Sequence, residues 1–312
     1  MHVKGASKPL LILAVSAATL SGIGGYAWHE SRRPAALELF VFDTPGAPAI
    51  LIRTPRDKRI LINGGANSDI VERLTGVLPF YSRRIDLVIA TKADAKNATG
   101  LIDVLNRYQV DGAVIPSVTL EGLGLASSTD PIYEIFKKTL ADKKVPTESV
   151  SAGKRIVFDQ GANNGDAGTV TADIIFPVSA DSAFKYSQAS GPETLLRINY
   201  GQTSVVLAGS ASLKVQKYIA ITSLTPADAI IFSHSAVASG ISRELVDSLA
   251  PDSIIYSQTV TKDPKNPVVV SKAKAKADPL AGILNERRYN VQESGVVKIT
   301  SDSSSLQIKK TL

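Results

Sequence analysis

Residues 85–101 read IDLVIATKADAKNATGL, and this segment decides the fold. The apolar run from Ile85 to Ala90 is typical of a strand that is buried on both faces. A short polar loop follows, and Leu101–Tyr108 has the spacing of a helix. The segment therefore predicts a strand, a loop and a helix, with polar side chains placed where the strand ends.

Strand and helix patterns alternate on both sides of this segment. Strand patterns occur at Leu37–Phe42, Ala49–Arg53, Arg59–Asn63, Ala113–Pro116, Thr194–Asn199, Ser204–Ala208, Ala229–Phe232, Ser253–Ser257, Val296–Thr300 and Leu306–Ile308. Helical spacing occurs at Ser68–Leu78, Ser127–Lys144, Ala211–Ile219 and Arg243–Leu249. Hairpins and strands that alternate with helices predict an α/β fold, in which two mixed sheets are sandwiched between helices.

The composition is that of an ordinary globular protein. The chain has 312 residues, of which 44% are hydrophobic and 21% charged, and this argues against wholesale disorder. It contains no cysteine, which excludes disulfides and thiolate metal sites. The net charge of +6 suits an anionic partner, and a basic surface without a partner is the plain alternative.

Residues 9–28 contain no charged side chain and predict a transmembrane anchor. As a helix they would be about 30 Å long, which matches the hydrocarbon core of a bilayer. A cleaved signal peptide is the alternative, although the small residues that a cleavage site prefers fit poorly here. We therefore expect a short head at 1–8, the anchor at 9–28, a linker at 29–36 and one large domain at 37–312.

Residues 85–101 resemble the metal-binding segment of metallo-β-lactamase folds, and in particular the I-D-L-V-I-A-T-H-P-D-A-D-H-I-G-G-L of the ComEC DNA-uptake competence family. The resemblance covers most of the chain from Leu37 to Leu312. It implies a metallo-β-lactamase-like αββα sandwich, preceded here by one transmembrane helix. Further segments that resemble the family are Leu39–Ile52, Leu61–Gly65, Leu207–Ala211, Phe232–Ala236 and Val291–Ile299.

The chain departs from the family at the positions that would bind metal. Lys92 and Asn97 stand in place of histidines, and Lys96 stands in place of an aspartate. Ser210 replaces the bridging aspartate, and a neutral hydroxyl cannot take over that role. By this resemblance the former metal-site positions are Lys92, Asp94, Lys96, Asn97, Ser210, His234 and Ser235.

Three histidines occur in the whole chain, at positions 2, 29 and 234. A two-zinc centre draws on several imidazoles and a bridging carboxylate. His2 and His29 flank the apolar segment, which leaves His234 alone. We therefore expect no catalytic residue, no metal ligand set and no zinc or other cofactor in this domain.

Lys92 and Lys96 would place two ammonium groups where a dication sits in the family. We expect them to pair with Asp94, and in part with Asp43, in a closed salt-bridge cluster. The alternative is that both are surface lysines at the tip of a loop.

A second basic element is the lysine-rich segment at 261–278. It is either a solvated loop or a phosphate-binding strap. Its lysines are Lys262, Lys265, Lys272, Lys274 and Lys276.

These patterns predict a single-pass membrane protein with its main domain outside the cytoplasm. We expect a ComEC-like, catalytically inactive binding or scaffold module linked to DNA uptake or to the cell envelope. Its expected partners are the membrane, through residues 9–28, and DNA or an envelope or competence protein. The sequence does not identify a small-molecule substrate. The alternatives are a metal-dependent hydrolase or nuclease whose ligands come from elsewhere, and a purely structural envelope protein.

Overall fold

A computed structural model describes residues 36–79, 81–116, 130–161, 168–176, 193–222, 224–257 and 287–311. Residues Ala36–Leu312 form one compact unit. The expected anchor at 9–28 and the lysine-rich segment at 261–278 lie outside the described residues. Within the described part of the chain, no helix is long and apolar enough to cross a membrane.

The first sheet has eight strands, in the order β17-β16-β1-β2-β3-β5-β7-β8. In that order, neighbouring strands from β17 to β3 are antiparallel, and neighbouring strands from β3 to β8 are parallel. The edge strand β17 carries the exposed Lys309 and Lys310. The strands are β1 Leu37–Phe42, β2 Ala49–Arg53, β3 Arg59–Ile62, β5 Leu87–Ile89, β7 Ala113–Pro116, β8 Thr147–Val150, β16 Val296–Ser301 and β17 Leu306–Thr311.

The second sheet has seven strands, in the order β15-β14-β13-β12-β11-β10-β9. Strands β9 to β12 are antiparallel and β12 to β15 are parallel, so both sheets are mixed, as the sequence predicts. The strands are β9 Arg155–Asp159, β10 Val170–Phe176, β11 Leu195–Tyr200, β12 Thr203–Gly209, β13 Ala229–Phe232, β14 Ser253–Tyr256 and β15 Arg288–Asn290.

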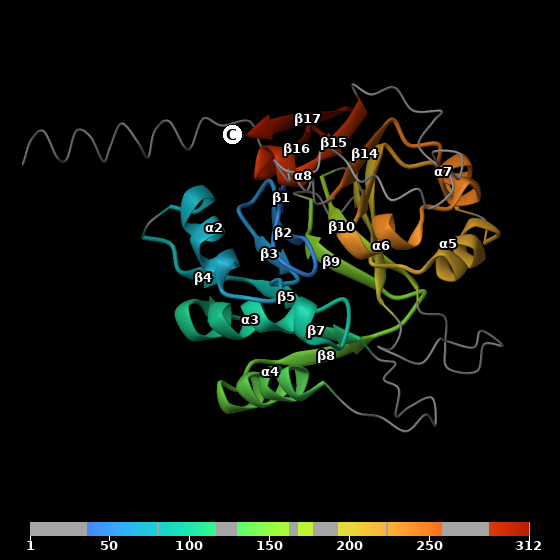
Figure 1. Cartoon of the computed structure of the whole chain (residues 1–312). Coiled ribbons are helices and arrows are strands. Elements are labelled where there is room, and N and C mark those ends of the chain that lie inside the picture. Colours follow the sequence, from blue (N-terminus) through green and yellow to red (C-terminus); the bar gives the residue numbers. More distant parts are fainter. Residues whose placement is uncertain are drawn as a thin grey trace, which may run out of the picture. The chain divides into compact units, whose positions relative to one another are not determined.

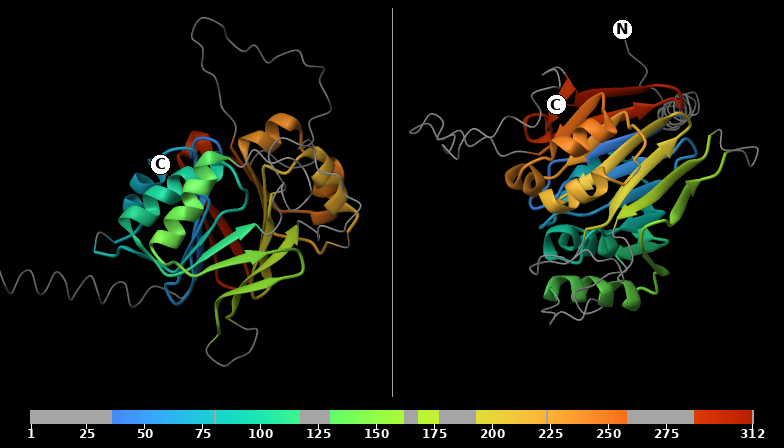
Figure 2. Two further views of the ribbon diagram at one scale, coloured as in Figure 1. Left: turned by 90° about the horizontal axis from the view of Figure 1, so that it is seen from below. Right: turned by 90° about the vertical axis from the view of Figure 1, so that its right-hand side faces the viewer.

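Helices cover the outer faces of the two sheets (Figure 1). The view from below shows the two helix groups on opposite sides, with the sheets between them (Figure 2). On the eight-stranded sheet lie α2 Asp69–Val77, α3 Ala95–Arg107 and α4 Pro131–Asp142. On the seven-stranded sheet lie α5 Leu213–Ala220, α6 His234–Ser239 and α7 Arg243–Leu249, and α8 Val291–Ser294 precedes β16.

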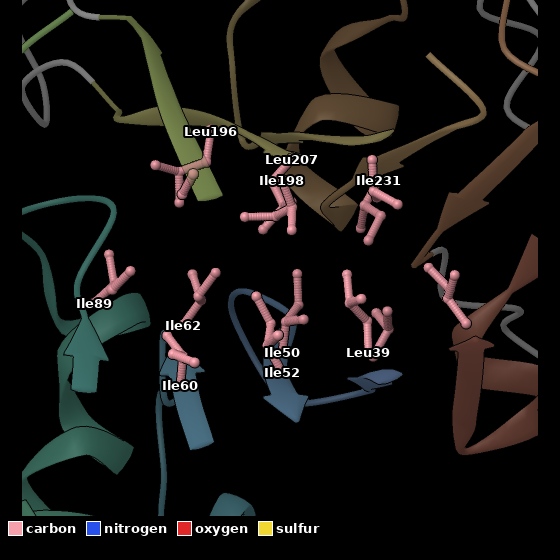
Figure 3. Close-up of a cluster of buried hydrophobic side chains, with 14 of the residues drawn as sticks. Leu39, Ile50, Ile52, Ile60, Ile62, Ile89, Leu196, Ile198, Leu207 and Ile231 are labelled. Atoms are coloured by element: carbon pink, nitrogen blue, oxygen red, sulfur yellow. The ribbon is translucent and has the colours of Figure 1, made fainter. Parts of the chain in front are cut away.

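Three apolar clusters account for this layering. Side chains alternate across a strand, so Ile50 and Ile52 face the other sheet while Leu51 faces the helices. The central cluster fills the space between the sheets with branched side chains (Figure 3). Fully burying each such side chain contributes about 1.5–3 kcal/mol, so this layer is the main cohesive contact between the sheets.

Three local predictions differ from the structure. The expected strand at Ile85–Ala90 is split into β4, Arg84–Ile85, and β5, because the Asp86 carboxylate binds the backbone N–H of Arg59. Strand β4 pairs with β6, Gln109–Val110. Helix α3 begins at Ala95, before the expected Leu101, because Asp94 caps it. The expected helix at Ala211–Ile219 begins at Leu213 as α5, because Ser212 caps it.

Two glycines hold α3 against the loop that follows β3. The backbone N–H of Gly64 donates to the carbonyl of Asn97 at 2.9 Å, and that of Gly100 donates to the carbonyl of Gly65 at 3.2 Å. A Cβ atom on Gly100 would lie 2.0 Å from the Gly64 carbonyl oxygen. Glycine at position 100 therefore allows the close approach that places the start of α3.

We expect Gly100→Ala to lower the free energy of unfolding by about 1–3 kcal/mol, because the added methyl group forces the two segments apart. Gly76→Ala in α2 is the control, since no atom lies within 4 Å of its Cβ position. That change should instead stabilise by about 0.5–1 kcal/mol through helix propensity. Urea unfolding of both variants measures the effects, and equal shifts in the two would contradict the close contact.

Candidate functional site

The strands of both sheets deliver polar residues to one edge of the sandwich. Asn63 follows β3, Lys92 follows β5, Ser210 follows β12 and Ser233 follows β13. The carboxyl ends of strands are the usual place for a site in an α/β fold. This edge is therefore the candidate site.

The loop between β5 and α3 is fixed by Asp94. Its Oδ1 accepts from the backbone N–H of Asn97 at 3.1 Å and from the Asn97 side-chain amide at 2.6 Å. Asp130 steadies the same turn, because its Oδ2 accepts from the N–H of Ala95 at 2.7 Å. Asp94 thus serves as a helix cap, a role that stabilises a helix by about 1 kcal/mol.

Lys92 is folded into the site. Its side chain is 14% exposed, and its Nζ lies 3.7 Å from Oδ2 of Asp94, so the predicted pairing of these two residues is confirmed. Lys96 is exposed and forms no ion pair with any described residue. Lys96 is therefore a surface lysine, as the alternative predicts, whereas Lys92 is not.

Asp43 does not join the cluster as expected. Its Oδ1 accepts a hydrogen bond from the Ser257 hydroxyl at 2.9 Å. On the other side of the site, the Oδ1 of Asn63 accepts from the N–H and the hydroxyl of Thr91, at 2.9 and 3.1 Å. These bonds fix the end of β3 beside the end of β5.

Glu193 is a site residue that the sequence patterns did not reveal. It is 7% exposed, and its Oε2 accepts from the backbone N–H of Ser210 at 2.7 Å and from the Ser210 hydroxyl. Gly209 has φ +50°, and a Cβ there would lie 1.8 Å from Oε1 of Glu193. The glycine before Ser210 was the available signal, because it marks a point where another group comes close.

The electrostatics of Glu193 combine opposing effects. Burial raises the pKa of its carboxyl above the ordinary value, and the nearby charge of Asp94 adds to that rise. The hydrogen bonds from Ser210 and the positive charge of Lys92 lower the same pKa. Lys92 therefore acts on carboxylates at the ends of both sheets.

His234 and Ser235 lie beside this cluster. His234 is exposed at the first position of α6, and Ser235 is partly buried next to it. Ser233 is fully buried, and its hydroxyl caps α6. The imidazole of His234 therefore lies at the surface. The residues that the structure brings together are Lys92, Asp94, Asn97, Glu193 and Ser210.

The enclosed space at this edge has a volume of about 10 Å³. Its lining includes Asn63, Thr91, Glu193, Thr194 and Ser233. A single water molecule needs about 10–15 Å³ on this measure, so the space admits one water at most.

The residues present do not fit a two-metal centre. Zinc is bound by imidazole, thiolate and carboxylate groups with free lone pairs. Here Asp94 and Glu193 already accept protein hydrogen bonds, and the Lys92 ammonium lies beside Asp94. Among the described residues, no group of three or more His, Cys, Asp or Glu side chains is arranged to hold a metal ion.

We expect Glu193→Gln to raise the free energy of unfolding at neutral pH, because glutamine keeps an acceptor for Ser210 without the buried charge. The pKa of Glu193 in the folded protein lies above its ordinary 4.5. The carboxylate therefore opposes folding above the folded-state pKa, and this effect disappears as the pH falls towards 4.5. The gap between variant and wild type should shrink over that range in urea unfolding.

Lys92→Met is the companion variant. It leaves Asp94 and Glu193 without their cation and should cost about 3 kcal/mol, the low end for breaking a buried pair from one side. The cost should be smaller in the Glu193→Gln background, because one carboxylate is already neutral. Equal costs in both backgrounds, or a pH-independent effect of Glu193→Gln, would count against the cluster.

No protein-family model and no curated protein matches the chain. Among solved structures it is similar to a variant of the CmlA β-hydroxylase, with 16% identity over 81% of this chain and 52% of that chain, and a TM-score of 0.45. It is also similar to a Cronobacter sakazakii metallo-β-lactamase, with 13% identity, 68% and 92% coverage and a TM-score of 0.42. A third similar structure is a subclass B3 metallo-β-lactamase from a soil metagenome. It has 14% identity over 67% of this chain and 81% of that chain, and a TM-score of 0.39. The chain thus spans about half the length of the hydroxylase and most of the two lactamases.

Proposed function

We propose that this chain is a ComEC-like metallo-β-lactamase-fold module that acts by binding and not by metal-dependent hydrolysis. One observation carries the proposal: at the edge that would hold metal, the Lys92 ammonium lies 3.7 Å from the Asp94 carboxylate, and the neighbouring space beside Asn63 and Glu193 has a volume of only about 10 Å³. Segments that resemble the family's metal motifs end at this edge, which supports the fold assignment.

Coulomb's law shows how strongly Lys92 opposes a metal ion. A dication about 4 Å from an ammonium is repelled by about 8 kcal/mol at an effective dielectric constant of 20, twice the value for two unit charges. Asp94 and Glu193 would have to give up protein hydrogen bonds to compensate.

The remaining parts of the proposal rest on the sequence. We propose that residues 9–28 anchor the chain in a membrane and that the main domain lies outside the cytoplasm. The partner we favour is DNA, because the chain carries a net charge of +6 and its lysine-rich segment holds five lysines within 261–278. An envelope or competence protein as partner is the other outcome.

Elemental analysis of the purified full chain tests the loss of metal chemistry. We expect far less than one equivalent of zinc or manganese, and no phosphodiesterase activity. The triple variant Lys92→His, Lys96→Asp, Asn97→His restores the family's side chains in the loop. It should still not hold stoichiometric zinc, because Ser210 and the buried Glu193 remain. One or two metal ions per wild-type chain, with activity that a chelator removes, would establish the hydrolase alternative.

Salt dependence tests the DNA partner. If five lysines contact phosphates, the slope of log affinity against log salt is about −4.5 for duplex DNA, and a four-fold rise in salt weakens binding about 500-fold. Replacing Lys262, Lys265, Lys272, Lys274 and Lys276 by Gln should remove most of this slope. Fluorescence anisotropy with a labelled duplex measures both quantities.

A control variant removes five positive charges from other parts of the protein surface. It replaces five exposed lysines by Gln: Lys138, Lys143, Lys144, Lys154 and Lys309. The proposal predicts a nearly unchanged slope for this variant. A DNA affinity that does not change with salt concentration would rule out a DNA site in the lysine-rich segment. Equal losses of affinity in the two variants would rule it out as well.

A further inference from the structure

A second hollow lies away from the strand-end site, on the outer side of the eight-stranded sheet. It has a volume of about 240 Å³ and forms where α2 ends, where the loop to β4 passes and where α3 ends. One wall is apolar and the other carries polar groups. The residues that matter here are Val71, Leu78 and Pro79 on the first wall and Arg83, Arg107 and Tyr108 on the second.

Arg83 and Arg107 stand out among the arginines near this surface. Neither forms an ion pair or a side-chain hydrogen bond with another described residue, whereas Arg84 pairs with Asp111 at 2.6 Å. Both guanidinium groups act on the same phenol: burial raises the pKa of Tyr108, and the two positive charges oppose that rise. The geometry agrees with this, because Arg83, Arg107 and Tyr108 line the same hollow.

A simpler explanation accounts for only one of the two arginines. Arg107 lies in the last turn of α3, where the helix dipole attracts a positive charge. Arg83 comes from a separate loop and gains nothing from that helix turn. Both arginines are exposed and line the same hollow, so two positive charges are available there to an anion.

The side chains that line the hollow indicate which class of anion it would bind. Arginine presents a planar fork of donors that matches phosphate, and two such forks suit a group with two negative charges. A phosphate monoester carries nearly two charges at neutral pH, and the Tyr108 hydroxyl supplies a further donor. The hollow is smaller than the roughly 300–1,000 Å³ of pockets for drug-sized ligands, which limits the size of the substituent.

We propose that this hollow binds the phosphate group of a monoester, with a small apolar substituent packed against Val71, Leu78 and Pro79. This site is separate from the strand-end site, and it does not depend on the function proposed above. Soluble aryl or alkyl phosphates and the headgroup of phosphatidic acid present the same chemistry.

Calorimetric titration of the full chain tests the proposal with three probes: inorganic phosphate, phenyl phosphate and dihexanoyl phosphatidic acid. Phenyl phosphate should bind more tightly than inorganic phosphate, because only the ester reaches the apolar wall. Tighter binding of the lipid than of phenyl phosphate assigns the site to a lipid headgroup, and equal binding assigns it to soluble esters. Absence of binding by all three probes overturns the proposal.

Variants locate the binding. Arg83→Gln and Arg107→Gln should each weaken phenyl phosphate at least about ten-fold, the effect of losing a charge-assisted hydrogen bond. Tyr108→Phe should weaken it several-fold and leave the fold intact. Arg84→Gln is the matched control, because it removes the same charge one residue away from Arg83 and should change affinity by less than about two-fold. An equal loss in Arg84→Gln and Arg83→Gln shows general surface attraction and overturns the site.

Discussion

The buried carboxyl group of Glu193 constrains the strand-end region. Removing a carboxylate from water costs several kcal/mol unless hydrogen bonds and an opposite charge compensate. Ser210 supplies two hydrogen bonds, Lys92 supplies the positive charge, and Gly209 leaves the space that the carboxylate fills. The Glu193 side chain thus constrains which residues fit at positions 92, 209 and 210.

The residues of this cluster come from both sheets. Lys92 follows β5 of the eight-stranded sheet, whereas Glu193 and Ser210 flank the β11–β12 hairpin of the seven-stranded sheet. The apolar layer between the sheets is non-directional and does not fix how the strand ends meet. A directional bond does so: the backbone N–H of Thr194 donates to the carbonyl of Thr91 at 2.6 Å, which fixes the start of β11 beside the end of β5.

Much of this arrangement is predictable from sequence because it is local. Strand patterns predict most strands around the central core, although not β8, β9 or β10, and the polar run after Ile89 predicts the loop that holds Lys92 and Asp94. Glu193 was missed because its role arises only from folding, which brings it against a serine seventeen positions later. The two arginines were missed for the same reason, since they converge from separate elements. Asp86 escaped notice because a single carboxylate inside an apolar run gives no periodic signal.

The outermost strand of the larger sheet has a consequence for behaviour in solution. An unpaired strand edge offers free N–H and C=O groups to any other extended chain, which is the first step of fibril growth. In β17 the exposed Lys309 and Lys310 occupy that border. A second copy that approached it would bring like charges together and bury their hydrated ammonium groups. The border therefore discourages self-association while leaving the hydrogen bonds of β17 to β16 undisturbed.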